Sequence, residues 1–175
     1  MRRRREARER AVQFLFQHEL NPPEDLQAAL DHFWDAQRSN AVLERLPGAT
    51  WGEKVEIPPP TADDVAMRVF ADSLIRGALE HQEQADETIR KFTKNWEISR
   101  LAVVDRNVLR LAIYEIMFRD DIPPIVSINE AVDIAKKFST DQSGRFVNGI
   151  LDKVKETILR PARTAKESNP GASPA

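Results

Sequence analysis

The sequence contains no cysteine, and no apolar run in it approaches the length of a membrane-spanning helix. Without cysteine, the chain can have no disulfide framework, thiolate metal site or cysteine nucleophile, so its stability must come from packing. A bilayer span needs roughly 20 apolar residues, and Arg, Asp or Pro interrupts every candidate here. We therefore expect a soluble protein of the reducing cytoplasm, without membrane contact.

Sequence motifs for catalysis and for metal or cofactor binding are also lacking. The three histidines, His18, His32 and His81, are far apart and do not show the i, i+4 spacing of a helical zinc site. No nucleophile elbow, phosphate loop or dinucleotide fingerprint occurs. We expect a protein that is not an enzyme and needs neither metal nor cofactor.

Positive charge is concentrated at the start of the chain, although the formal net charge is only -2. Residues 1–10 carry six arginines against two glutamates, whereas the remainder has an acidic excess. Such a segment suits phosphate contacts, because neutralising phosphates releases counterions. The alternative interpretation is a solvated arm with no ligand.

Apolar residues recur at helical spacing along the chain and predict helices without a strand. The third predicted helix is long, from Thr61 to Phe92, and Asp105 is the predicted N-cap of a nearly all-apolar helix that must be surrounded. A cap at 139–141 starts the last helix. The predicted helices cover about 6–20, 26–37, 61–92, 106–118, 125–138 and 141–160.

Two segments lack this periodicity. Residues 39–60 include Pro47-Gly48 and three consecutive prolines, Pro58 to Pro60, which cannot continue a helix. Residues 161–175 are rich in Ala, Ser, Pro and Gly, and the sequence predicts a disordered tail. We expect one helical domain at 1–160, with a first lobe at about 1–94, a second at about 95–160, and the proline-rich insert within the first.

Three phenylalanines lie at the edges of their apolar stripes, close to cationic residues: Phe16, Phe138 and Phe146. Exposed rings can stack on unpaired bases while neighbouring cations hold phosphates, which is the design of single-stranded RNA sites. The alternative for each ring is that it completes the core. We expect the arginine segment and the junction before Phe146 to come together in one patch.

Four segments resemble the NusB family of transcription antitermination factors. They are Arg8–Phe16 (RERAVQFLF), Val104–Glu115 (VDRNVLRLAIYE), Ile128–Phe138 (INEAVDIAKKF) and Phe146–Lys153 (FVNGILDK). The resemblance implies an all-α fold, a compact bundle of about seven helices in two small lobes. It also implies binding of boxA-type RNA of ribosomal operons together with the ribosomal protein NusE, within the RNA polymerase antitermination complex.

The resemblance also assigns candidate residues to each partner. The implied RNA surface comprises Arg2, Arg3, Arg4, Arg5, Arg8, Phe16, Phe138, Gln142, Arg145, Phe146, Asn148 and Lys153. The implied partner surface comprises Asp105, Arg106 and Pro124. Gln142 departs from the acidic residue expected there, and segments 39–60 and 161–175 have no counterpart in the family pattern. Some relatives form homodimers, so the oligomeric state is open.

Two further hypotheses compete with an RNA adaptor. In the first, the chain is a protein-interaction module whose arginines only solubilise it. In the second, it is the RNA-binding lobe of a methyltransferase, which would require a cofactor domain on a separate chain because no glycine-rich cofactor loop occurs here.

Overall fold

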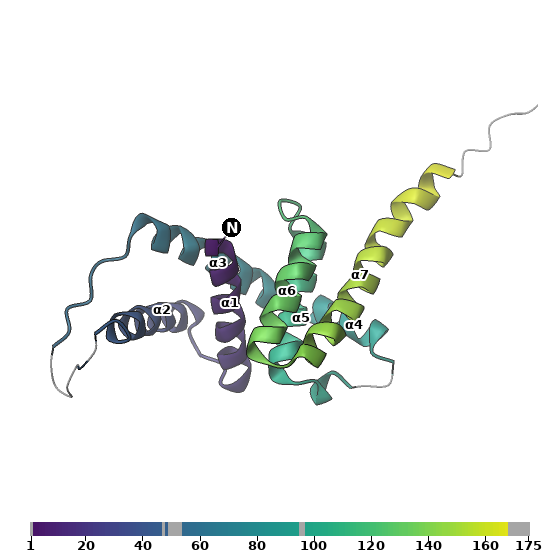
Figure 1. Cartoon of the computed structure of the whole chain (residues 1–175). Helices are drawn as coiled ribbons and strands as arrows, with labels where there is room; N and C mark the ends of the chain where they lie inside the picture. The colour runs from purple at the N-terminus through teal and green to yellow at the C-terminus, as the bar shows by residue number, and fades with distance from the viewer. Residues whose placement is uncertain (1, 47, 49–53, 95–96, 168–175) are drawn as a thin grey trace, which may run out of the picture. The chain divides into compact units, whose positions relative to one another are not determined.

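The computed structural model describes residues 2–46, 48, 54–94 and 97–167, and these ranges contain helices and no strand (Figure 1). The prediction of an all-α protein is confirmed. The elements in chain order are α1 (Arg2–Leu20), α2 (Leu26–Leu43), α3 (Ala62–Glu80), α4 (Gln82–Phe92), the 3-10 helix η1 (Ile98–Arg100), α5 (Val103–Phe118), α6 (Pro124–Phe138) and α7 (Asp141–Glu167).

The chain divides into two compact units, Met1–Arg76 (unit 1) and Gly77–Ala175 (unit 2). The division falls within α3, earlier than the boundary near residue 94 that the sequence indicates. The reason is that α4 packs on α5, where the Asp86 carboxylate of α4 accepts two hydrogen bonds from Arg110 of α5.

Unit 1 packs α1, α2 and the first part of α3 around aromatic side chains. The rings of Phe14 in α1 and Phe33 in α2 meet edge to face, with centroids 5.4 Å apart. Trp34 of α2 donates its indole N–H to Asp72 of α3 over 2.8 Å. The buried indole therefore has the hydrogen-bond partner that its polar atom requires.

Unit 2 is built around α5, in which residues 105–116 are all buried. The prediction that this helix is surrounded is confirmed, and even its polar strip is buried, because Arg110 pairs with Asp86. Two further hydrogen bonds join it to neighbouring helices. Ser127 of α6 donates to Glu115 over 2.5 Å, and Ser143 of α7 donates to Asp105 over 2.9 Å.

The prediction of a single helix from Thr61 to Phe92 is wrong, because the structure has a turn at His81 between α3 and α4. The His81 amide still donates to Gly77 and the His81 carbonyl still accepts from Ala85, so the chain bends without losing these bonds. The bend lies where Gly77 approaches the Tyr114 ring of α5. Tertiary packing, which helical periodicity does not encode, sets this break.

Three predicted helix ends also need correction. Helix α2 continues past Gln37 to Leu43. Helix α5 begins at Val103 with Ala102 as N-cap, so Asp105 is not a cap; its side chain bonds to Ser143 instead. Helix α7 continues through Pro161 to Glu167, because a proline removes one backbone hydrogen bond without having to end the helix.

Three further sequence expectations concern the cap of the last helix, the C-terminal tail and membrane-spanning helices. The cap of the last helix is confirmed, since Thr140 Oγ1 accepts from the Ser143 amide over 3.1 Å. The part of the predicted tail at 168–175 lies outside the described residues. Across the described helices, none is long and apolar enough to cross a membrane.

Candidate functional site

The arginines at the start of α1 differ in their exposure to solvent. Arg3, Arg4 and Arg5 are exposed, whereas Arg8 is only 4% exposed. The guanidinium carbons of Arg4 and Arg8 lie 5.1 and 5.4 Å from the centre of the Phe70 ring in α3, within the range of a cation–π interaction. Phe70 therefore holds Arg4 and Arg8, two of the residues predicted to bind RNA, against α3.

Arg3 faces the N-terminus of α3. Its Nη1 lies 3.4 Å from the Asp64 carboxylate and 3.6 Å from that of Glu6. The side-chain and backbone hydrogen bonds from Thr61 hold the pKa of Asp64 below its usual value, so this carboxylate stays charged beside Arg3. Arg2 also belongs to α1, but its side chain is outside the described part.

Burial separates Phe16 from its neighbours in α1. Phe14 and Leu15 are each 3% exposed, whereas Phe16 is half-buried. The prediction that Phe16 lies at the edge of the apolar stripe is confirmed. Part of the Phe16 ring therefore remains accessible to a ligand, while the buried part anchors the side chain in unit 1.

In unit 2, a second group of candidate residues lies at the junction of α6 and α7, which pack side by side (Figure 1). Phe138, the last residue of α6, is half-buried, and Lys137 Nζ lies 5.5 Å from the centre of its ring. The Thr140 cap then starts α7 directly. The junction thus holds a ring and a cation next to one helix end.

The first turns of α7 continue this surface. Phe146 is half-buried, while Gln142, Arg145 and Lys153 are exposed. Residues 142, 146, 149 and 153 follow i, i+3 and i+4 steps and so share one helix face. Gly149 is exposed, and nothing lies within 4 Å of the position of a Cβ there, so the surface beside Phe146 is open.

Asn148 and Gly144 have local roles in α7. The exposed Asn148 amide donates to Asp152 over 3.1 Å, so it is engaged within the helix. Gly144 is buried, and a Cβ there would lie 2.7 Å from Lys136 Cγ. The absence of a side chain at Gly144 therefore lets α6 and α7 pack closely.

The residues predicted to bind a protein partner are mostly internal. Asp105 and Arg106 are each 8% exposed. Asp105 accepts from Ser143, and Arg106 Nη1 donates to the carbonyls of Ile98 and Leu101 over 2.8 and 3.3 Å. They tie α5 to α7 and η1, whereas Pro124 is half-buried at the start of α6.

Four large apolar side chains close to Pro124 in the sequence are exposed. They are Met117, Phe118, Ile125 and Val126, each 38 to 49% exposed, and they are called the apolar patch below. Large apolar side chains clustered on a surface mark interaction sites more often than scattered ones do. Helical periodicity does not reveal this exposure, because Met117 and Ile125 fit the apolar stripes of their helices.

Phe70 and Lys137 are two further residues that sequence reasoning missed. Phe70 fits the apolar stripe of α3, and only the packing of α1 shows that its ring carries Arg4 and Arg8. Lys137 had a weak signal, its position next to Phe138. In the described ranges, no group of three potential metal ligands occurs.

The chain matches the model of the NusB family over residues 5–156. It is 41% identical over 156 residues to the transcription antitermination protein NusB of Desulfitobacterium hafniense, covering 89% of each chain. It is 43% identical over 159 residues to that of Methylacidiphilum infernorum, covering 91% of this chain and 94% of the relative.

Solved structures show the same similarity. The structure of T. maritima NusB has a TM-score of 0.67 and 37% identity, covering 87% of this chain and 90% of that one. A crystal structure of the antitermination factors NusB and NusE in complex with double-stranded RNA has a TM-score of 0.66 and 25% identity. The match covers 90% of this chain and 98% of that one.

Proposed function

The chain belongs to the NusB family, and from this premise we propose that it is an RNA-binding transcription antitermination factor that acts with the ribosomal protein NusE. Its RNA target is the boxA-type sequence of ribosomal operons. The observation that carries the proposal is the family match over residues 5–156, which includes both the second half of the arginine segment and the whole α6–α7 junction.

In unit 2, the α6–α7 junction binds unpaired bases. Phe138 and Phe146 are half-buried, so each ring is anchored on one side and can stack on a base with the other. Lys137, Arg145 and Lys153 supply cations for the adjoining phosphates. Gln142 and Asn148 add hydrogen-bonding groups that can contact base edges or sugars.

In unit 1, the exposed arginines Arg3 to Arg5 contact the RNA backbone, and Arg2 extends this segment. Arg8 is buried, so it acts as a positioning residue: with Phe70 it fixes the helix that carries the exposed arginines. Phe16 offers one ring edge on the same helix. Family membership supports a shared role for the two units, and their meeting in one patch remains a prediction.

NusE docks on the apolar patch of Met117, Phe118, Ile125 and Val126 beside Pro124. Apolar and aromatic side chains dominate the centres of protein interfaces, where charged residues are depleted. Asp105 and Arg106 support this surface from within by fixing α5. The protein then acts as a non-enzymatic adaptor in the cytoplasm, holding RNA and NusE for RNA polymerase.

Fluorescence anisotropy with a labelled single-stranded boxA RNA tests the proposal. We expect the full-length chain to bind the RNA, with higher affinity after NusE is added and lower affinity at higher salt. A scrambled RNA of the same length is the control for sequence preference. Equal affinities for boxA and scrambled RNA, with and without NusE, would contradict the proposal.

Charge reversal separates an RNA adaptor from a module that only docks proteins. Arg4→Glu with Arg5→Glu should abolish most RNA binding and leave NusE binding unchanged, because these side chains lie in unit 1 and the apolar patch lies in unit 2. RNA affinity that survives the double substitution would favour the docking module. Binding of S-adenosylmethionine would favour the methyltransferase hypothesis.

A further inference from the structure

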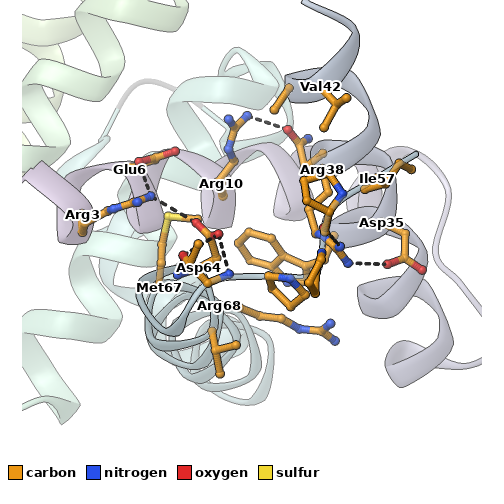
Figure 2. A pocket seen from close by; sticks show the side chains of 18 of the residues that line it. Arg3, Glu6, Arg10, Asp35, Arg38, Val42, Ile57, Asp64, Met67 and Arg68 are labelled. Carbon is orange, nitrogen blue, oxygen red and sulfur yellow. Dashed lines mark hydrogen bonds and ion pairs between the residues drawn. The ribbon is translucent and has the colours of Figure 1, made fainter. Parts of the chain in front are cut away.

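A groove in unit 1 has Arg3, one of the proposed RNA contacts, among its lining residues, whereas its other lining residues have no role in the function proposed above. Residues of α1, α2, α3 and the proline segment 57–60 line it, and its cavity volume is about 670 Å³ (Figure 2). Pockets of roughly 300 to 1,000 Å³ hold small organic ligands. The groove is therefore large enough for a small molecule.

The groove contains a cation that lacks a carboxylate partner. Arg10 is half-buried, and its Nη1 donates to the side-chain oxygens of Gln37 over 2.6 Å and Gln13 over 3.2 Å. Among the described residues, no Asp or Glu forms an ion pair with it. Because half-buried charges are costly without compensation, an anion bound beside Arg10 would be stabilised.

The carboxylates that line the groove are engaged by other groups. Glu6 and Asp64 pair with Arg3. Asp72 accepts from Trp34 and pairs with Arg68. Figure 2 shows Asp64 turned toward Arg3 and away from Arg10. These acids therefore do not neutralise Arg10.

Two further arginines add positive charge on the α2 side. Arg38 Nη2 donates to the carbonyl of Pro58 over 2.5 Å, while its Nη1 lies 3.9 Å from an Asp35 carboxylate whose side chain is 73% exposed. That ion pair is weak because water screens it. Arg45 is exposed at the rim, without an ion pair among the described residues.

The groove also has an apolar wall. Val42 of α2, Ile57 of the proline segment and Val65 of α3 line it, and Ile57 and Val65 are 42 and 48% exposed. The following prolines have fixed φ angles, and the bond from Arg38 to Pro58 attaches this segment to α2. The wall is thus held in place before any ligand arrives.

We propose that this groove binds a small organic anion whose phosphate or carboxylate contacts Arg10, Arg38 and Arg45 and whose apolar part packs on Val42, Ile57 and Val65. Cation and apolar wall face the same cavity, so neither an inorganic anion nor an uncharged apolar molecule uses the whole site. Phosphate and carboxylate groups both accept hydrogen bonds from guanidinium groups, so either can be the charged part of the ligand.

Calorimetric titration of the full-length protein with phenyl phosphate and with benzoate tests the inference and identifies the preferred oxyanion. We expect at least one to bind about tenfold more tightly than either inorganic phosphate or phenol. Arg10→Gln should weaken that binding about tenfold. Arg90→Gln, which removes one exposed arginine from α4 in unit 2, is the charge-matched control and should bind like the unsubstituted protein.

Ile57→Ser tests the apolar wall in a segment without helical structure, so it should weaken binding without changing the thermal unfolding midpoint. The inference is overturned if neither probe binds more tightly than phosphate and phenol, or if Arg10→Gln, still folded, binds as well as Arg90→Gln. Displacement of the bound probe by single-stranded RNA would also overturn it, because the groove would then belong to the RNA surface.

Discussion

At the residue scale, burial determines how much an Arg–Asp ion pair contributes to stability. Arg110 with Asp86 and Arg119 with Asp121 both form two parallel hydrogen bonds of 2.6 to 2.8 Å through Nε and Nη2. The Asp86 side chain is 11% exposed and that of Asp121 is 56% exposed. Removing one partner of a buried pair leaves a buried charge, whereas water compensates an exposed one.

We therefore expect Asp86→Ala to lower the free energy of unfolding by about 3 to 5 kcal/mol. Asp121→Ala, which breaks an ion pair of the same geometry, should lower the free energy of unfolding by less than about 1 kcal/mol. Urea unfolding of both variants measures the difference. Similar losses in the two variants would show that burial does not control the strength of these pairs.

The half-buried ring of Phe146 leads to a second prediction at this scale. Phe146→Ala should weaken boxA RNA binding by about 1 to 3 kcal/mol, because one stacked base loses its platform. Phe146→Tyr keeps the ring and should retain most of the affinity. RNA anisotropy checks both, and an unchanged titration for Phe146→Ala would reject the stacking role.

At the scale of the elements, two helical glycines have opposite surroundings. A Cβ on Gly77 of α3 would lie 2.0 Å from Cζ of Tyr114, whose ring is buried and stacks near His81 and Phe118. A Cβ on Gly149 of α7 would meet nothing within 4 Å. The first glycine is required by helix packing, and the second is not.

Gly77→Ala should therefore lower the free energy of unfolding by about 1 to 3 kcal/mol, because the Tyr114 ring must move. Gly149→Ala should raise it by about 0.5 to 1 kcal/mol through the better helix propensity of alanine. Thermal or urea unfolding measures both. A stabilising Gly77→Ala would contradict the close approach of α3 and α5.

The N-terminus of α3 provides a pH prediction. Hydrogen bonds from the Thr61 hydroxyl and amide hold the pKa of Asp64 below its usual value, so the unfolded state binds more protons at acidic pH. The stabilisation is full above the unfolded pKa of about 4 and is lost as pH falls through the lower folded pKa.

Urea unfolding of the native chain and of Asp64→Asn between about pH 2 and 7 checks this sign. The native chain should be more stable by a constant amount above about pH 5, and the difference should shrink as the pH falls below about 4. A difference that grows toward acidic pH would contradict the assignment.

At the scale of the whole molecule, charge distribution matters more than net charge. The chain has a formal net charge of -2, yet exposed cations occur in both units, Arg3 to Arg5 in α1 and Arg145 and Lys153 in α7. RNA binding therefore depends on local cations that release counterions. The acidic remainder discourages nonspecific binding of RNA elsewhere on the surface.

Salt dependence tests this distribution. With the exposed Lys137, these cations make six phosphate contacts, and at about 0.7 per contact they give a slope of about -4.2 for the logarithm of RNA affinity against the logarithm of salt concentration. Arg145→Gln should reduce the magnitude of the slope by about 0.7, and Arg90→Gln should leave it unchanged. Equal slopes for the two variants would remove Arg145 from the phosphate contacts.

Much of the fold follows from the sequence. Periodic apolar residues predict the helices, the buried character of α5 and the cap at Thr140, because a helix repeats its contacts locally along the chain. The edge position of Phe16 follows from the same periodicity. Family motifs then identify the candidate RNA residues, since these lie within short, continuous segments.

Tertiary structure alone decides which of these residues are exposed. It buries Arg8 beside Phe70, turns Asp105 and Arg106 inward, exposes Met117 and Ile125, and bends the predicted long helix at His81. Each outcome depends on side chains distant in sequence that meet only after packing. Helical spacing determines the face on which a side chain lies, whereas the neighbouring helix determines whether that face meets water.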